Sequence, residues 1–174
     1  TNKGWDFALQ WLQDFGPGSF KLDTQWTLQE EAITALFEDT VRDLNGQFGE
    51  PETVGRIWLT YDWEDWSFFW GINYIGEVSN HEDFGGDTAT YRGEEVRVVL
   101  EADAVWYNNL SVSKYFNNGG LKLTAGIRNA FDQEPPRVTT MGLGQVSTAG
   151  YSAFYSQYDY FGRRYFLNLT WDFM

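Results

Sequence analysis

The sequence predicts an all-β protein whose antiparallel strands form part of a transmembrane β-barrel, and three observations lead to this prediction. Apolar and polar residues alternate over seven stretches, the loops between them are short and long by turns, and aromatic residues gather beside the short loops. Alternation with a period of two is typical of strands, because successive side chains leave opposite faces of a sheet. Barrels of the outer membrane sort their loops in this way, with short turns at one end and long loops at the other.

Composition narrows the classes of function. The chain of 174 residues has no Cys, so it can form neither a disulfide nor a thiolate metal site. Its net charge of −13 argues against nucleic acid, which binds basic surfaces. This charge fits either a soluble surface or acidic outer loops that concentrate cations. Aromatic residues make up 19% of the chain, and so many rings need a core, a membrane or a ligand to pack against.

The first two strands are predicted to form a tight hairpin. Gly4–Phe15 and Phe20–Gln29 both alternate, and Gly16-Pro17-Gly18 lies between them. Pro fixes φ and Gly permits positive φ, so this tripeptide favours an immediate turn.

The next stretch changes its period, and it predicts a short helix inside the first long loop. Apolar residues recur at helical spacing between Glu31 and Leu44, acidic residues occupy the first turn, and Asn45-Gly46 is a typical stop. An irregular loop with chance spacing is the alternative.

Five further strands complete the predicted set. Their expected bounds are Thr53–Trp63, Trp66–Ile75, Val96–Phe116, Leu121–Arg128 and Tyr165–Phe173. Short turns are expected at Glu64-Asp65 and Asn117–Gly120, and long loops at roughly Gly76–Glu94 and Ala130–Gly162. The Val96–Phe116 strand exceeds the ~9–11 residues that span a bilayer, so its first half is expected to stand outside the membrane.

Alternation assigns the strand residues to two faces. The residues expected to face lipid are Trp5, Leu9, Leu22, Trp26, Leu59, Trp70, Ile72, Leu123, Ile127, Leu167 and Leu169. The residues expected to face the lumen are Asp6, Gln10, Asp23, Gln25, Thr60, Asp62, Asn73, Thr124, Arg128, Asn168 and Thr170. Aromatic rings beside the short turns and at the chain end would form a girdle at the periplasmic interface. These are Phe15, Phe20, Trp63, Trp66, Tyr115, Phe116, Trp171 and Phe173.

The last third of the chain carries a set of short motifs in a fixed order. Asn129-Ala130-Phe131-Asp132 is followed by Pro135-Pro136, then by Tyr158-Asp159 with Gly162-Arg163, and the chain closes with an alternating strand that ends at Phe173. This arrangement resembles the C-terminal end of TonB-dependent outer-membrane receptors, with Met174 as a departure after the usual final Phe.

The resemblance implies both an architecture and a function. The barrel of this family has about 22 strands and a plugged lumen. Residues 1–174 would be the C-terminal seven strands of the barrel domain, and the plug domain has no counterpart in this sequence. The implied function is TonB-dependent transport of a scarce ligand across the bacterial outer membrane. That ligand would be a metal chelate, cobalamin, an oligosaccharide or a peptide. The implied partners are outer-membrane lipid, the remainder of the barrel with its plug, the TonB system acting through the plug, and the ligand.

Candidate ligand-binding residues lie in the last long loop, where aromatic rings could stack on sugars or flat chelates. They are Tyr151, Phe154, Tyr155, Tyr158, Tyr160 and Phe161. The alternative is that these rings pack the loop onto the rim of the barrel. No catalytic set, phosphate loop or metal-ligand spacing occurs, so neither an enzyme nor a cofactor is expected. The only histidine, His81, lies in a polar loop, where a solvated side chain is the ordinary outcome.

Two other classes of protein remain open from the sequence. One is a small passive or structural outer-membrane barrel of about eight strands, complete in itself. The other is a soluble, aromatic-rich carbohydrate-binding β-protein. A requirement for detergent separates the soluble protein from both membrane proteins, and the mass of the native polypeptide separates a small barrel from a segment of a receptor.

Overall fold

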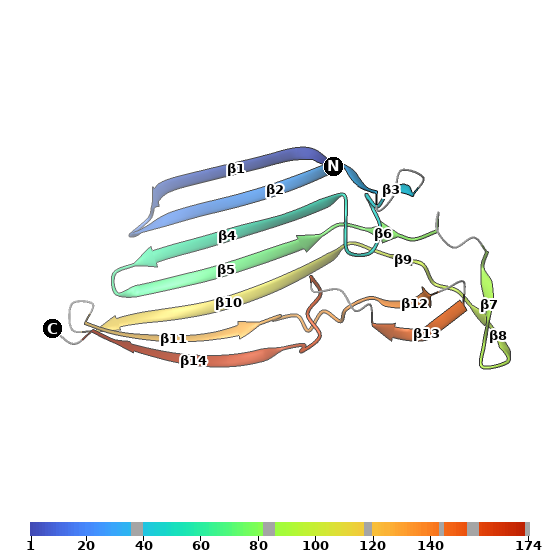
Figure 1. Ribbon diagram of the computed structural model, residues 1–174. Coiled ribbons are helices and arrows are strands. Elements are labelled where there is room, and N and C mark those ends of the chain that lie inside the picture. The colour runs from blue at the N-terminus through green and yellow to red at the C-terminus, as the bar shows by residue number, and fades with distance from the viewer. Residues whose placement is uncertain (36–39, 82–85, 117–119, 143–144, 153–156, 173–174) are drawn as a thin grey trace.

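The computed structural model describes residues 1–35, 40–81, 86–116, 120–142, 145–152 and 157–172, and these residues form an all-β structure with antiparallel sheets and no helix (Figure 1). One large sheet contains most of the strands. Three two-stranded sheets lie beside one end of it.

The large sheet is a meander in which each strand pairs with the next along its path. Its strands are β1 (Asn2–Phe15), β2 (Gly18–Ala35), β4 (Thr53–Trp63), β5 (Trp66–Ile75), β10 (Val105–Phe116), β11 (Leu121–Arg128) and β14 (Arg164–Trp171), and β3 (Val41–Asp43) pairs with the far end of β2. Each of the seven predicted strands has a counterpart in this sheet, although one of them is shorter than predicted. In a meander successive connections fall at opposite ends of the sheet, so this path puts the short connections at one end and the long connections at the other.

The predicted sorting of the loops is confirmed. In Figure 1 the turns that join β1 to β2 and β4 to β5 lie at the left end of the sheet, as do the ends of β10 and β11 that flank residues 117–119. The three long connections lie at the right end. Residues 117–119 themselves lie outside the described residues.

The prediction of a helix between Glu31 and Leu44 is wrong for the described part of that stretch. β2 continues to Ala35, and its last residues pair with β3 through Ile33↔Asp43 and Ala35↔Val41. The Asp43 carboxylate accepts hydrogen bonds from the backbone N–H of Ala32 at 2.9 Å and of Asn45 at 3.0 Å, which fixes this pairing. β-branched residues at both strand ends also favour extended backbone over helix. Residues 36–39 lie outside the described residues.

The predicted single strand Val96–Phe116 is also corrected. The chain forms β8 (Glu94–Arg97) and β9 (Glu101–Ala102), and it enters the large sheet only at β10. β8 pairs with β7 (Thr88–Tyr91), and β9 pairs with β6 (Val78–Ser79). Val98 and Leu100 are buried between these pieces, so their alternation reflects packing among the loops rather than a strand of the large sheet. The third long loop likewise contains a hairpin of β12 (Arg137–Gly142) and β13 (Gln145–Ser152).

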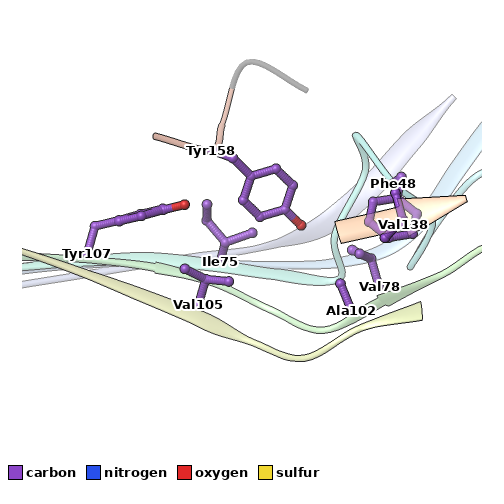
Figure 2. Packing of buried hydrophobic residues seen from close by; sticks show 8 residues of the cluster. All are labelled: Phe48, Ile75, Val78, Ala102, Val105, Tyr107, Val138 and Tyr158. Atoms are coloured by element: carbon purple, nitrogen blue, oxygen red, sulfur yellow. The ribbon is translucent and has the colours of Figure 1, made fainter. Parts of the chain in front are cut away.

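The buried core lies at the loop end of the large sheet and not along its middle. Eight buried apolar residues form one cluster there, and Figure 2 shows Tyr158 reaching down from the last loop above Ile75, with Tyr107 on one side and Val138 on the other. The cluster consists of Phe48, Ile75, Val78, Ala102, Val105, Tyr107, Val138 and Tyr158. Every residue of β1, in contrast, is exposed.

Strand register divides the large sheet into an apolar and a polar face. Directly paired residues share a face, so chains of pairs such as Leu22↔Leu59↔Trp70↔Leu110↔Ile127 define an apolar face across five strands. Every residue predicted to face lipid lies on this apolar face, and every residue predicted to face the lumen lies on the polar face. Within the described residues β1 pairs only with β2 and β14 only with β11, so the sheet does not close on itself.

Candidate functional site: the motif junction and the two faces of the sheet

The Asn129 side chain closes a turn at the end of β11. It is 1% exposed and has a φ of +48°, a conformation that Asn tolerates better than most residues. Its Nδ2 donates to the carbonyl of Gln133 at 2.9 Å, and its Oδ1 accepts from the N–H of Gln133 at 2.8 Å. Its own N–H donates to Oδ1 of Asn109 on β10 at 3.1 Å. The turn is therefore held to the neighbouring strand.

Asp132 then joins this turn to the start of β14. Oδ1 of Asp132 accepts from the backbone N–H of Arg163 at 2.8 Å. The preceding Gly162 has a φ of +67°, and a Cβ there would lie 3.0 Å from the same Oδ1. Glycine is thus favoured at 162 both by its backbone conformation and by the close carboxylate. The turn of Asn129 and Asp132 and the start of β14 at Arg163 therefore form one hydrogen-bonded junction, although they are about 30 residues apart in the sequence, and Gly162 lies against the Asp132 carboxylate within it.

Tyr158 and Asp159 complete this junction from the loop side. Tyr158 is 4% exposed and packs in the core cluster (Figure 2). Asp159 accepts from Arg164 at 2.8 Å and from the N–H of Phe161 at 2.9 Å. The Arg164 guanidinium also lies over the Phe161 ring, 4.9 Å from its centroid. Of the other motif residues, Phe131 is exposed, Pro135 and Pro136 are half-buried, and Phe173 lies outside the described residues.

The structure places the described members of the predicted ligand-binding set in different surroundings. Tyr158 is in the core cluster, whereas Tyr160 and Phe161 are 41% and 79% exposed. Tyr151 belongs to β13, and Phe154 and Tyr155 lie outside the described residues. For Tyr158 the geometry matches the packing alternative, because its ring joins the loop to the end of the sheet. Tyr160 and Phe161 keep surface that a ligand could reach.

Aromatic rings border the apolar face at both ends. At the loop end Trp26, Tyr74 and Trp106 form one cluster, with centroid distances of 5.5 Å for Trp26–Tyr74 and 4.4 Å for Tyr74–Trp106. At the turn end Trp63, Trp66 and Phe68 are exposed on the same face, and the last two rings stack at 6.4 Å. Tyr115 pairs with Lys122 and therefore lies on the polar face, apart from the other described members of the predicted girdle.

The polar face carries an aromatic platform that the sequence analysis missed. The Phe69 ring lies over Gly71, and the Phe166 ring lies over Gly126, where a Cβ would overlap it. Trp58 contacts Phe69 edge to face at 6.4 Å. Two cations flank these rings, since Arg56 lies 4.1 Å from the Trp58 centroid and Arg128 lies 5.6 Å from that of Phe166. Two features of the sequence could have indicated this platform. Each strand concerned carries an isolated Gly or an aromatic residue at a position where the alternation calls for a polar residue.

The loop end holds an acidic pocket of about 610 Å³ whose lining includes Glu52, Glu77, Glu101 and Asp103. His81 Nε2 lies 3.8 Å from Glu101 at the neighbouring hollow. Within the described ranges no three His, Cys, Asp or Glu side chains lie close enough to hold a metal ion. The same ranges contain no helix long and apolar enough to cross a membrane.

Comparison of the chain with family models, with curated proteins and with solved structures finds no match in any of the three.

Proposed function

We propose that this chain is the C-terminal wall of an outer-membrane β-barrel that imports a scarce ligand with energy from the TonB system. The observation that carries the proposal is the large exposed apolar face. Trp5, Leu9, Trp70, Leu167 and Leu169 are all more than 40% exposed on it. A soluble protein rarely leaves an apolar surface of this extent uncovered, whereas a bilayer covers it fully.

The height of the apolar face supports a bilayer as its cover. Trp66 and Tyr74 mark its two aromatic borders on β5 and are eight residues apart. At ~3.3 Å per residue the strand distance is about 26 Å, and a tilt of ~40° reduces it to about 20 Å. This is close to the ~25 Å apolar band of outer-membrane barrels. A groove of about 740 Å³ between Leu59, Trp70, Val112 and Ala125 on this face would accept lipid chains.

The assignment to TonB-dependent import rests on the motif junction. Asn129, Asp132, Tyr158 and Gly162 stand in the order in which that receptor family carries them. Here Asp132 joins the end of β11 to the start of β14, Asn129 closes the turn that holds Asp132, and Tyr158 packs in the core cluster. The small passive barrel is less well supported, because it requires β1 to pair with β14. The soluble carbohydrate-binding protein is less well supported because it leaves the apolar face without a cover.

The test begins with fractionation of cells that produce the native protein. We expect the polypeptide in the outer-membrane fraction, soluble only with detergent, with a mass well above the 20.1 kDa of this chain. Growth on scarce nutrients should then show an uptake that is lost both when the gene is deleted and when TonB is deleted. Uptake that persists without TonB would favour a passive barrel, and a protein soluble without detergent would refute the membrane assignment.

A further inference from the structure

A pocket of about 360 Å³ lies on the polar face, between the middle of the sheet and the loop end of β11. It is lined by Phe69, Asn109, Leu110, Ser111, Arg128 and Phe166. All of these except Leu110 belong to the polar face, because Phe69 pairs with Ser111, Ser111 with Gly126 and Gly126 with Phe166. Its volume lies in the lower part of the range typical of small-molecule sites.

The cation of this pocket is Arg128, and no carboxylate partner for it is found among the residues that the structure describes. Among the described residues no Asp or Glu forms an ion pair with Arg128. The neighbouring Arg164, its direct partner across β11 and β14, is in contrast paired with Asp159 at 2.8 Å. One guanidinium is therefore neutralised within the chain, and the other remains available beside the pocket. A guanidinium presents a planar fork of donors that matches a carboxylate.

The remaining walls supply a stacking surface and neutral polar groups. The Phe166 ring lies over Gly126 of the adjacent strand β11, and the Phe69 ring lies over Gly71 of its own strand β5, so both rings are held close to the sheet. Oδ1 of Asn109 is occupied by the N–H of Asn129 at 3.1 Å, which leaves its NH₂ group to donate. Ser111 adds a hydroxyl that can donate or accept.

From this arrangement we propose that the pocket binds a ring that carries a carboxylate. Arg128 holds the carboxylate, the Phe166 and Phe69 rings contact the flat side of the ligand ring, and Asn109 and Ser111 bind its other oxygens. Both a sugar acid and an aromatic acid have this chemistry. The proposal deepens the proposed function, since it names a class of ligand for a face that would line the lumen.

The test is equilibrium binding to the full native protein, purified in whatever medium keeps it folded. The probes are galacturonate and benzoate, with galactose and benzyl alcohol as neutral partners and acetate as an acid without a ring. We expect at least one ring acid to bind more tightly than its neutral partner and than acetate. The preference between galacturonate and benzoate identifies the source of the ring.

Matched variants assign the binding to the pocket. Loss of a charge-assisted hydrogen bond in Arg128→Gln should weaken ring-acid binding about tenfold or more. Arg128→Lys keeps the charge without the fork and should bind with intermediate affinity. Lys122→Gln removes the same charge from the same face of the same strand, outside the pocket, and should change affinity less than twofold. Phe166→Leu should weaken binding of the ring acid and leave acetate unchanged.

The proposal is overturned if no ring acid binds the native protein. It is also overturned if acid and neutral partners bind equally, or if Arg128→Gln behaves like Lys122→Gln. Its failure is distinguishable from failure of the proposed function. An outer-membrane protein that binds no ring acid refutes the pocket alone, whereas a detergent-independent protein that binds through Arg128 refutes the transport function alone.

Discussion

The Asp132 carboxylate accepts a hydrogen bond from the backbone N–H of Arg163 at 2.8 Å, although 31 residues separate the two along the chain. The two ends of the third long loop, at Asp132 and Arg163, therefore lie next to each other. Asp132 itself has a φ of +57°, a backbone conformation that costs most residues about 1–2 kcal/mol and Asn or Asp less. Asp is therefore favoured at position 132 for two reasons: it tolerates the positive φ of the turn, and its carboxylate binds the backbone at the start of β14.

This relationship predicts different outcomes for two substitutions at Asp132. Asp132→Ala removes the acceptor and places a residue without a compensating side chain at positive φ, so it should lower the free energy of unfolding by about 1–3 kcal/mol. Asp132→Asn keeps an acceptor oxygen and tolerates the conformation, so it should cost less than half as much. Thermal unfolding of the purified protein, followed by circular dichroism, measures both. Equal losses in the two variants would contradict the role of the acceptor.

A second prediction concerns the contact between Trp26 and Gly55 on the apolar face. A Cβ at position 55 would overlap the Trp26 indole, which is held by a 2.8 Å hydrogen bond to Thr24 and by contacts with Tyr74 and Trp106. Gly55→Ala should therefore destabilise the protein by about 1–3 kcal/mol through overpacking. The Trp26→Leu background removes the obstacle, and there the same change should be nearly neutral. A loss of the same size in both backgrounds, measured by urea unfolding, would rule out this contact as the cause.

The division of the sheet into two faces was predictable because it depends only on a period of two within each strand. The assignment of individual neighbours was not. Phe166 breaks the alternation of β14, and the reason is that its ring occupies the space above Gly126 on β11. That pairing depends on the register between two strands separated by the third long loop. A single sequence shows the odd Phe and the lone Gly without showing that they meet.

Two predictions about the fold were wrong because the residue pattern in each stretch fits two different structures. Ile33 and Val41 have helical spacing, but both belong to strands that pair near Asp43. Val98 and Leu100 alternate as in a strand of the large sheet, yet they are buried among the loops. Of the candidate ligand residues, Tyr158 was predicted from its residue type alone, and its burial became apparent only from the folded loop.

The polarity of the two faces predicts a strong dependence on position for an inserted charge. Leu169 and Thr170 are adjacent, exposed and on opposite faces of β14. If the apolar face contacts lipid, Leu169→Arg should destabilise the protein, by up to the roughly 2–4 kcal/mol that applies at the bilayer midplane, whereas Thr170→Arg should be close to neutral. The yield of folded protein in the outer membrane, read from heat-modifiable migration on gels, measures the difference. Similar yields from both variants would refute the assignment of the faces.

Asp43 predicts a local dependence on acidity at the pairing of β2 with β3. Hydrogen bonds from the backbone N–H of Ala32 and of Asn45 hold the pKa of this carboxyl below its usual value of 3.8. Because the folded-state pKa is depressed, the stabilisation is present above that usual value and is lost as pH falls through the lower folded-state pKa. The amides of Ala32 and Asn45 should therefore lose protection from hydrogen exchange only as the pH falls below 3.8, after correction for intrinsic rates. In Asp43→Asn the protection should be weaker and independent of pH, and an unchanged acid transition in that variant would assign it to another group.

The two edge strands give the last prediction. Within the described residues β1 and β14 each pair on one side only, so these residues supply no strand for their outward N–H and C=O groups. In hydrocarbon each unmet backbone group costs several kcal/mol, and the proposed function therefore requires that further strands cover both edges in the native protein. We expect every amide from Gly4 to Phe15 and from Tyr165 to Trp171 to exchange slowly in the native membrane protein, as those of the doubly paired β4 do. If alternate amides of both edge strands exchange quickly while β4 stays protected, the edges are free and the chain is not the wall of a larger barrel.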